Sequence, residues 1–221
     1  MGTSISLTAA DGHALSAWRA GPEGATRGLV VVQEIFGVNA HIRGVAERFA
    51  AQGYLVIAPA LFDRVRPGIE LGYTPDDVTE GLAVRAKVPE AGALADIAAA
   101  AAALGGRRLG IVGYCWGGSL AWLGATRTTL FAAASGWYGG GIAAARAETP
   151  HCPVQLHFGA EDHGIPLTDV ELIRAAQPAV EIHIYPGAGH GFGCDARGSF
   201  SPPDAALAQE RTLAFFARNL V

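Results

Sequence analysis

The segment from Gly110 to Gly118, G-I-V-G-Y-C-W-G-G, constrains the fold more than any other part of this 221-residue chain. Residues 109–112 are apolar and β-like, and Gly113 and Gly117 stand two residues either side of Cys115. Glycines at these positions let a strand turn sharply into a helix. The pattern is that of a nucleophile elbow, with a thiol in place of the usual serine hydroxyl. It predicts Cys115 at the apex, where a helix N-terminus favours the thiolate. The alternative is a buried cysteine in an ordinary glycine-rich turn.

An acid and a histidine follow Cys115 in the chain order that α/β-hydrolases use. Asp162 comes after an apolar strand predicted for residues 154–158, and His190 comes after one predicted for residues 180–185. Because the carboxyl ends of parallel strands share one edge of a sheet, the three side chains can converge there. Histidine would take the thiol proton and later protonate the leaving group, while aspartate would fix the tautomer of the ring. We therefore predict a Cys115–His190–Asp162 triad.

Strand-like and helix-like segments alternate along the rest of the chain. A β-hairpin is predicted over residues 4–19, with its turn at Asp11-Gly12. The remaining expected strands are 29–32, 54–58, 109–112, 130–137, 154–158 and 180–185, and the expected helices are 41–52, 91–104, 117–125, 167–177 and 203–220. This alternation predicts an α/β-hydrolase fold, with a mostly parallel sheet and helices on both faces. No insertion is long enough for a lid domain, so one domain is expected over residues 1–221.

Helical spacing of apolar residues assigns a buried face to two of these helices. For the alanine-rich helix 91–104 the predicted buried residues are Leu94, Ile97, Ala98 and Ala101. For the last helix, 203–220, they are Leu213, Phe216, Ala217 and Leu220.

Four motifs together resemble the dienelactone hydrolase family, the carboxymethylenebutenolidases, over nearly the whole chain. They are Gln33 to Asn39, the elbow from Gly113 to Gly118, Gly159 with Asp162-His163, and Gly187 to Phe192. The resemblance implies a cysteine-dependent hydrolase of small esters or lactones that acts through an acyl-enzyme. In combination these motifs are highly specific for the superfamily, but they are less specific for the substrate.

The resemblance also implies roles for residues around the thiol. Glu34 would contact the resting thiol of Cys115, and substrate binding would rearrange this contact and release a thiolate paired with His190. A capping or surface carboxylate is the alternative for Glu34. The oxyanion hole would consist of the backbone N–H groups of Ile35 and Trp116, the second of which is also expected from the elbow geometry alone.

The family pattern is broken at the substrate-binding arginines. Dienelactone hydrolases hold the substrate carboxylate with arginines, one of them shortly after the catalytic histidine. Here no arginine follows His190 before Arg197, and the region expected to carry the other is acidic until Arg85. Arg64, Arg66 or Arg85 could compensate, but each is interpreted as a solvated surface residue. Neutral esters or lactones are therefore expected to be turned over at least as well as carboxylate-bearing dienelactones.

Several aromatic residues lie near predicted strand ends. We predict that Phe36, Tyr138 and Phe192 bind substrate, with core packing as the alternative for each. The irregular stretch 61–89 is expected to rim the pocket. An open, shallow site of this kind favours small esters or lactones over lipids and long peptides.

Composition argues against several other classes of function. The net charge is −4 with scattered basic residues, and no apolar run reaches the ~20 residues of a membrane span, so neither nucleic acid nor membrane is an expected partner. An odd number of cysteines, Cys115, Cys152 and Cys194, in a chain without a secretory segment predicts reduced thiols in the cytoplasm. Monomer and small homo-oligomer are both left open.

Neither a cofactor nor a metal is expected. The residues that could ligate a metal are His157, Glu161, Asp162, His163 and His190, and their spacing fits no paired zinc pattern. The second hypothesis for function is a non-hydrolytic α/β-hydrolase relative that binds a ligand or regulates a partner. An intact triad argues against it, since a binding protein does not need one.

Overall fold

The computed structural model describes residues 2–221. Contacts between residues divide the chain into two compact units, Met1–Gly110 and Ile111–Val221. The single domain expected over residues 1–221 therefore stays a prediction. Among the described residues, no helix has the length and apolar character needed to span a bilayer.

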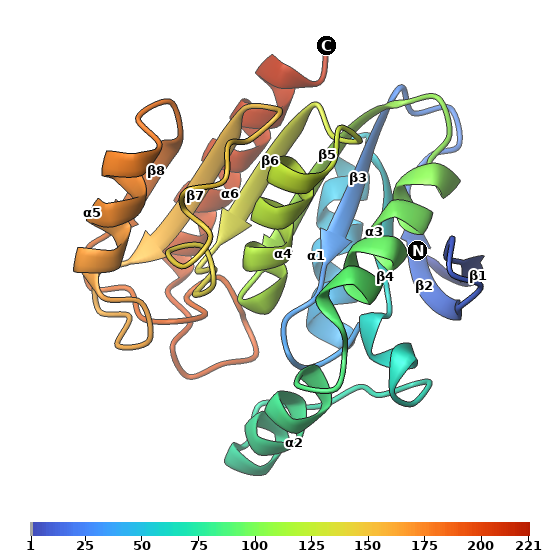
Figure 1. The fold of residues 1–221 in the computed structure, drawn as a ribbon, viewed down its shortest axis with the longest axis horizontal. Helices are drawn as coiled ribbons and strands as arrows, with labels where there is room; N and C mark the ends of the chain where they lie inside the picture. The colour runs from blue at the N-terminus through green and yellow to red at the C-terminus, as the bar shows by residue number, and fades with distance from the viewer. Residues whose placement is uncertain (1) are drawn as a thin grey trace. The chain divides into compact units, whose positions relative to one another are not determined.

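The first unit holds four strands and several helices, two of which cover the strands (Figure 1). Its strands are β1 (Thr3–Thr8), β2 (Ala14–Ala20), β4 (Leu55–Pro59) and β3 (Arg27–Val32), in that spatial order. Its helices are α1 (Ala40–Ala51), the 3-10 helix η1 (Leu61–Arg64), α2 (Pro75–Arg85) and α3 (Glu90–Ala103). Strands β3 and β4 are parallel, whereas β1–β2 and β2–β4 are antiparallel. Helices α1 and α3 pack on opposite faces of β3 and β4 (Figure 1).

Local sequence explains the first of these helices. The side chain of Asn39 caps α1 by accepting a hydrogen bond from the N–H of Ile42 at 3.2 Å. The apolar stripe predicted for this helix, Ile42, Val45, Ala46 and Phe49, is buried. Gly53 follows the helix with a φ of 85°, a conformation that favours glycine. Both the hairpin of β1 and β2 and the helix were correctly predicted.

The predicted face of α3 is partly wrong. Ile97 and Ala101 are buried as expected, but Leu94 and Ala98 are only half-buried. Asp96 is fully buried instead, because its two carboxylate oxygens accept hydrogen bonds from the guanidinium of Arg64, both at 2.8 Å. A count of apolar residues cannot find a face that includes a buried ion pair. The interpretation of Arg64 as a solvated residue is wrong for the same reason, since its side chain is 11% exposed.

The second unit holds four strands and three helices (Figure 1). Its strands are β5 (Arg108–Tyr114, which begins just before the boundary), β6 (Ala133–Trp137), β7 (Val154–Gly159) and β8 (Glu181–Tyr185), in that spatial order. Its helices are α4 (Trp116–Arg127), α5 (Leu167–Ala176) and α6 (Pro202–Asn219). Helices α4 and α6 lie on opposite faces of β6 (Figure 1). The pairs β3–β4, β6–β7 and β7–β8 are parallel, so the strands are mostly parallel, as predicted.

The buried face of α6 also differs from the prediction. Phe216 and Leu220 are buried as expected, but Leu213 is half-buried and Ala217 is exposed. Thr212 and Phe215 are buried in their place. Thr212 is fully buried because its hydroxyl bonds to groups on β6 and β7. Because threonine is polar, the spacing of apolar residues does not assign Thr212 to the buried face of the helix.

Candidate active site

Cys115 lies between β5 and α4, at the turn that the glycines make possible. Its backbone is strained, with φ 55° and ψ −116°. A Cβ on Gly113 would overlap the carbonyl of Gly117, and a Cβ on Gly118 would lie 2.5 Å from the carbonyl oxygen of Trp137. The N–H of Cys115 donates to that same carbonyl oxygen at 3.0 Å. The elbow is therefore held by close backbone contacts that larger side chains would prevent.

The three residues predicted as a triad lie together in the second unit. The Nε2 of His190 is 3.2 Å from the Sγ of Cys115, and its Nδ1 is 2.7 Å from Oδ2 of Asp162. The other oxygen of Asp162 accepts from the N–H of Gly164 at 2.9 Å. The Asp162 side chain is fully buried, that of His190 is 30% exposed, and Cys115 is partly exposed. A hydrogen-bonded chain thus runs from a buried carboxylate to a thiol that solvent can reach.

Opposing effects set the charge of His190. Burial disfavours the charged ring, but hydrogen bonds to Asp162 and Cys115 outweigh it and raise the pKa of His190 to about 10. These hydrogen bonds favour the charged form of the ring. Cys152 contrasts with this site, because burial alone raises the pKa of its thiol to about 11.

Tyr138 and Phe192, predicted to bind substrate, are fully buried in an aromatic cluster. The ring of Tyr138 lies 5.2 Å from the ring of His190, and its φ is 39°. Phe192 stacks on Trp137 at 5.7 Å between ring centroids. These contacts give both residues a packing role next to the triad. Their part in substrate binding stays a prediction.

Glu34 follows β3 in the first unit and is fully buried, which rules out a surface carboxylate. The hydroxyl of Tyr73 lies 3.1 Å from its Oε2, and the side-chain amide of Asn39 donates to the Tyr73 oxygen at 3.1 Å. Because a phenol has one hydrogen, and its oxygen already accepts from the amide, Tyr73 donates that hydrogen to Glu34. Phe36 packs on the Tyr73 ring at 4.5 Å. Sequence reasoning missed Tyr73, since no motif joins residues 39 positions apart.

The segment after Glu34 is held from one side by α2. The carbonyl of Ile35 packs so closely against Gly81 that a Cβ there would overlap it. On α4, Trp116 is the first helical residue, and backbone N–H groups in a first turn lack partners within the helix. These are the two residues predicted to supply the oxyanion hole, and that role stays a prediction.

The arginines fall into distinct environments. Arg64 also bonds to Asp11 at 2.8 Å, so its guanidinium is fully engaged. Arg66 is 66% exposed, and Arg85 is exposed as well. Arg197 lies across the backbone beside the triad histidine, since a Cβ on Gly191 would sit 2.6 Å from its Nη1. The position of Arg197 could not be predicted from the sequence, because it depends on the loop that brings this residue back to Gly191.

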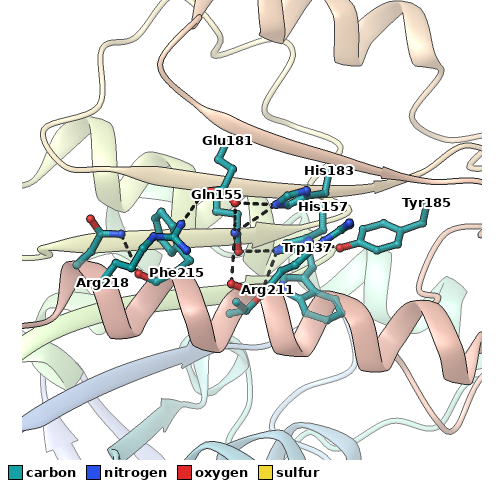
Figure 2. A network of polar contacts seen from close by, with 11 residues as sticks. Trp137, Gln155, His157, Glu181, His183, Tyr185, Arg211, Phe215 and Arg218 are labelled. Carbon is teal, nitrogen blue, oxygen red and sulfur yellow. Dashed lines mark hydrogen bonds and ion pairs between the residues drawn. The ribbon is translucent and has the colours of Figure 1, made fainter.

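Two other histidines near Asp162 in the sequence are poorly suited to act as the base. His157 on β7 is fully buried, and burial lowers its pKa well below the usual value. Its Nδ1 contacts the Tyr185 hydroxyl at 2.8 Å, and its Nε2 contacts Oε1 of Gln155 at 2.9 Å (Figure 2). His163 is exposed.

A strand–elbow–helix turn that carries a nucleophile, on a mostly parallel sheet covered by helices, defines the α/β-hydrolase class. The sequence pattern of the dienelactone hydrolase family matches residues 15–220, so the chain belongs to that family of carboxylic ester hydrolases.

Relatives and solved structures agree with this assignment. A Synechocystis protein named "Putative carboxymethylenebutenolidase" is 39% identical over 212 residues, 87% of this chain and 86% of its own. The carboxymethylenebutenolidase of Pseudomonas putida is 34% identical over 228 residues, 96% of this chain and 95% of its own. A crystal structure named "Putative Dienelactone Hydrolase", from Klebsiella pneumoniae, superposes with a TM-score of 0.82 at 34% identity. It covers 97% of this chain and 99% of that one.

Proposed function

We propose that this protein hydrolyses small esters or lactones through a Cys–His–Asp triad and an acyl-enzyme on Cys115. The observation that carries the proposal is the hydrogen-bonded chain from Cys115 Sγ to His190 Nε2 at 3.2 Å, and from His190 Nδ1 to Asp162 Oδ2 at 2.7 Å. The imidazolium beside the thiol and the N-terminus of α4 both stabilise a thiolate.

The reaction proceeds in two halves. In the first, the Cys115 sulfur attacks the ester carbonyl carbon, a C–S bond forms, and the carbonyl electron pair moves to oxygen. Backbone N–H groups of Trp116 and Ile35 stabilise that oxyanion. The tetrahedral species collapses, the C–O bond breaks, and His190 gives its proton to the leaving oxygen.

In the second half, water hydrolyses the thioester. Neutral His190 removes a proton from the water, whose oxygen attacks the acyl carbon. The C–S bond then breaks, the acid product leaves, and the thiolate–imidazolium pair returns. Asp162 keeps Nε2 directed at the reacting atoms throughout. Before substrate binds, Glu34 would contact the resting thiol, and substrate binding would rearrange this contact and release the thiolate paired with His190, a role that rests on the family resemblance.

The experiment compares hydrolysis of p-nitrophenyl acetate and of a small lactone by the wild type, Cys115→Ala and Cys152→Ala. We expect Cys115→Ala to lose at least ~10³-fold in kcat and Cys152→Ala to keep wild-type rates. Acid quenching during turnover should trap an acetyl group on the Cys115 peptide. Wild-type turnover by Cys115→Ala would contradict the proposal. A wild type that binds lactones without turnover would favour the ligand-binding alternative.

We further propose that neutral substrates are accepted at least as well as carboxylates. Arg64 is occupied by two aspartates, and Arg66 and Arg85 point to solvent. This leaves Arg197 as the arginine beside the triad that can test the idea. A lost charge-assisted pair costs roughly 1.5–3 kcal/mol, or about 10- to 150-fold in kcat/KM.

The measurement is kcat/KM for a dienelactone and its methyl ester, in the wild type, Arg197→Gln and Arg174→Gln. Arg174 is a matched control, since it is 45% exposed on α5 and pairs with Glu171. We expect a ratio near one or above for the ester in all three proteins. A strong preference for the free acid that Arg197→Gln alone abolishes would overturn this proposal.

The cytoplasm is the proposed compartment. No disulfide joins any of the three cysteines in the described residues, and the nucleophile must stay reduced to act. Thiol titration of protein purified without reductant should return three thiols per chain. A lower count would contradict a reduced protein.

A further inference from the structure

His157 is a fully buried histidine that the proposed reaction does not use. It lies on β7, among polar side chains from β8 and α6, as Figure 2 shows. Its ring nitrogens contact Gln155, Tyr185 and Thr212 at 2.8–3.1 Å. A buried polar group is stabilising only when its hydrogen bonds are satisfied, so the directions of these bonds are informative.

The side-chain amide of Gln155 fixes the proton on one ring nitrogen. Its NH₂ group donates to a carboxylate oxygen of Glu181 at 2.8 Å and to the backbone carbonyl of Arg211 at 3.4 Å. Its oxygen therefore faces His157 Nε2, at 2.9 Å (Figure 2). Because an amide oxygen only accepts, Nε2 of His157 carries the hydrogen.

The other ring nitrogen is then an acceptor. Burial, with smaller electrostatic effects of His183 and Arg211, keeps the pKa of His157 well below its usual value, which favours the neutral ring. Bare Nδ1 accepts the hydroxyl hydrogen of Tyr185 at 2.8 Å. This tautomer fits the contacts of the ring with Gln155 and Tyr185, and because both ring nitrogens are engaged inside the protein, His157 is not placed to exchange a proton with substrate. It acts by holding its neighbours in place.

One of those neighbours carries the backbone that holds the nucleophile. The indole Nε1 of Trp137 donates to Thr212 Oγ1 at 3.2 Å, and that oxygen lies 3.1 Å from His157 Nε2. The Trp137 and His157 rings are 4.9 Å apart. The carbonyl of Trp137 accepts the N–H of Cys115 at 3.0 Å. The network thus reaches the elbow through a single residue.

The residue that directly follows β6, Tyr138, lies beside the base. The N–H of Tyr138 donates to the backbone carbonyl of His157 at 2.7 Å, and its ring lies 5.2 Å from the ring of His190. Tyr138 and Cys115 are the non-glycine residues with positive φ in the described part of the chain. Strained conformations of this kind persist only where surrounding contacts fix them.

We propose that His157 is a positioning residue for the hydrolase, which fixes the end of β6 and through it both the Cys115 elbow and the His190 ring. The expected effect on catalysis rests on the proposed hydrolase function. Its effect on the thiol is separate, because the reactivity of Cys115 can be measured without turnover.

The experiment uses Thr212→Val, which keeps the shape of the side chain and removes the hydroxyl between Trp137 and His157. Thr212→Ser is the rescue variant, and Thr126→Val is the matched control. Thr126 is also a buried helical threonine, but its hydroxyl bonds to Glu148 at 2.8 Å, away from this network. Two quantities are measured for each: the rate constant for iodoacetamide labelling of Cys115, and kcat per site titrated by the p-nitrophenyl acetate burst.

We expect Thr212→Val to lower both quantities about tenfold, with KM changed less than about twofold, since small misplacements of reacting groups carry large rate costs. Thr212→Ser should restore both, and Thr126→Val should leave both unchanged. A purely structural role for the network would lower the number of titrated sites and leave both rates per site intact. That result would overturn the proposal.

Tyr185→Phe provides a second variant if Thr212→Val does not fold. It removes the donor to His157 Nδ1 and should lower both rates about threefold to tenfold. Unchanged labelling in both variants would refute positioning. If labelling slows but the wild type shows no turnover, the positioning inference stands and the proposed hydrolase function fails.

Discussion

His190 and His157 are both largely buried histidines of the second unit, yet their pKa values move in opposite directions. His190 bonds to a carboxylate and a thiol, and its pKa rises to about 10. His157 bonds to a phenol and an amide, and its pKa falls well below the usual value. Burial disfavours the charged ring in both. The charge of the hydrogen-bonding partner therefore decides the direction of the pKa shift. It distinguishes His190, which can transfer a proton, from His157, which stays neutral and holds its neighbours in place.

The comparison also shows why burial alone is a poor guide to catalysis. A perturbed pKa is often taken as a sign of a functional site. In His157 the perturbation comes mainly from desolvation, with smaller electrostatic effects of His183 and Arg211, and it disfavours the charged ring. In His190 it comes from Asp162 and Cys115, which lie in line with the ring.

The largest expected effect separates the two histidines directly. His190→Ala should lower kcat by at least ~10³-fold, because base catalysis and nucleophile activation are lost together. His157→Gln should lower kcat only about tenfold, since it disturbs position alone. The measurement is steady-state hydrolysis of p-nitrophenyl acetate, normalised to folded protein. Comparable losses of kcat in both variants would contradict the different roles given to the two histidines. Wild-type turnover by His190→Ala would mean that another residue is the base.

The second prediction removes the charge that distinguishes the two sites. Asp162→Asn replaces the carboxylate with an amide, so the pKa of His190 should fall and the site should come to resemble that of His157. We expect kcat to drop on the order of 10²-fold, less than for His190→Ala, because a thiol is a better nucleophile at neutral pH than an alcohol. A pH–rate profile would report the shift. An unchanged alkaline limb would mean that Asp162 does not set the charge of the ring.

The sequence was sufficient to predict a mostly parallel α/β fold and to expect Cys115, Asp162 and His190 near one another, for a clear physical reason. Cys115, Asp162 and His190 each follow a strand, and the carboxyl ends of parallel strands lie at one edge of a sheet. What it missed depends on single hydrogen bonds between distant residues. The pairing of Tyr73 with Glu34 and that of Arg64 with Asp96 have no period or motif. The same is true of Thr212, whose burial on α6 depends on an indole 75 residues away.

The third prediction concerns the thiols. Iodoacetamide should label Cys115 faster than Cys152, whose pKa of about 11 leaves about one thiol in 10⁴ ionised at pH 7. His190→Ala should slow labelling of Cys115 about tenfold and leave Cys152 unchanged, because the imidazolium stabilises only the nearby thiolate. Peptide mapping by mass spectrometry gives both rates. Full activity after labelling, with Cys115 unmodified, would contradict its assignment as nucleophile.

The smallest effect is on stability, and it should have opposite signs for the two histidines. We measure the pH dependence of stability in the Cys115→Ala variant, so that this thiol does not titrate. The pKa of His190 is raised by Asp162, so its contribution is complete below pH 6.5, the unfolded value, and is lost as pH rises above it. His157 is held neutral, so the unfolded chain binds the extra proton below pH 6.5 and stability falls as pH decreases. Each group changes the free energy of unfolding by at most ~1.4 kcal/mol per pH unit, a few degrees in Tm.

Adding His190→Ala should flatten only the alkaline limb of Tm against pH, and adding His157→Gln should flatten only the acid limb. Parallel curves for the two double variants would show that partner charge does not separate these histidines.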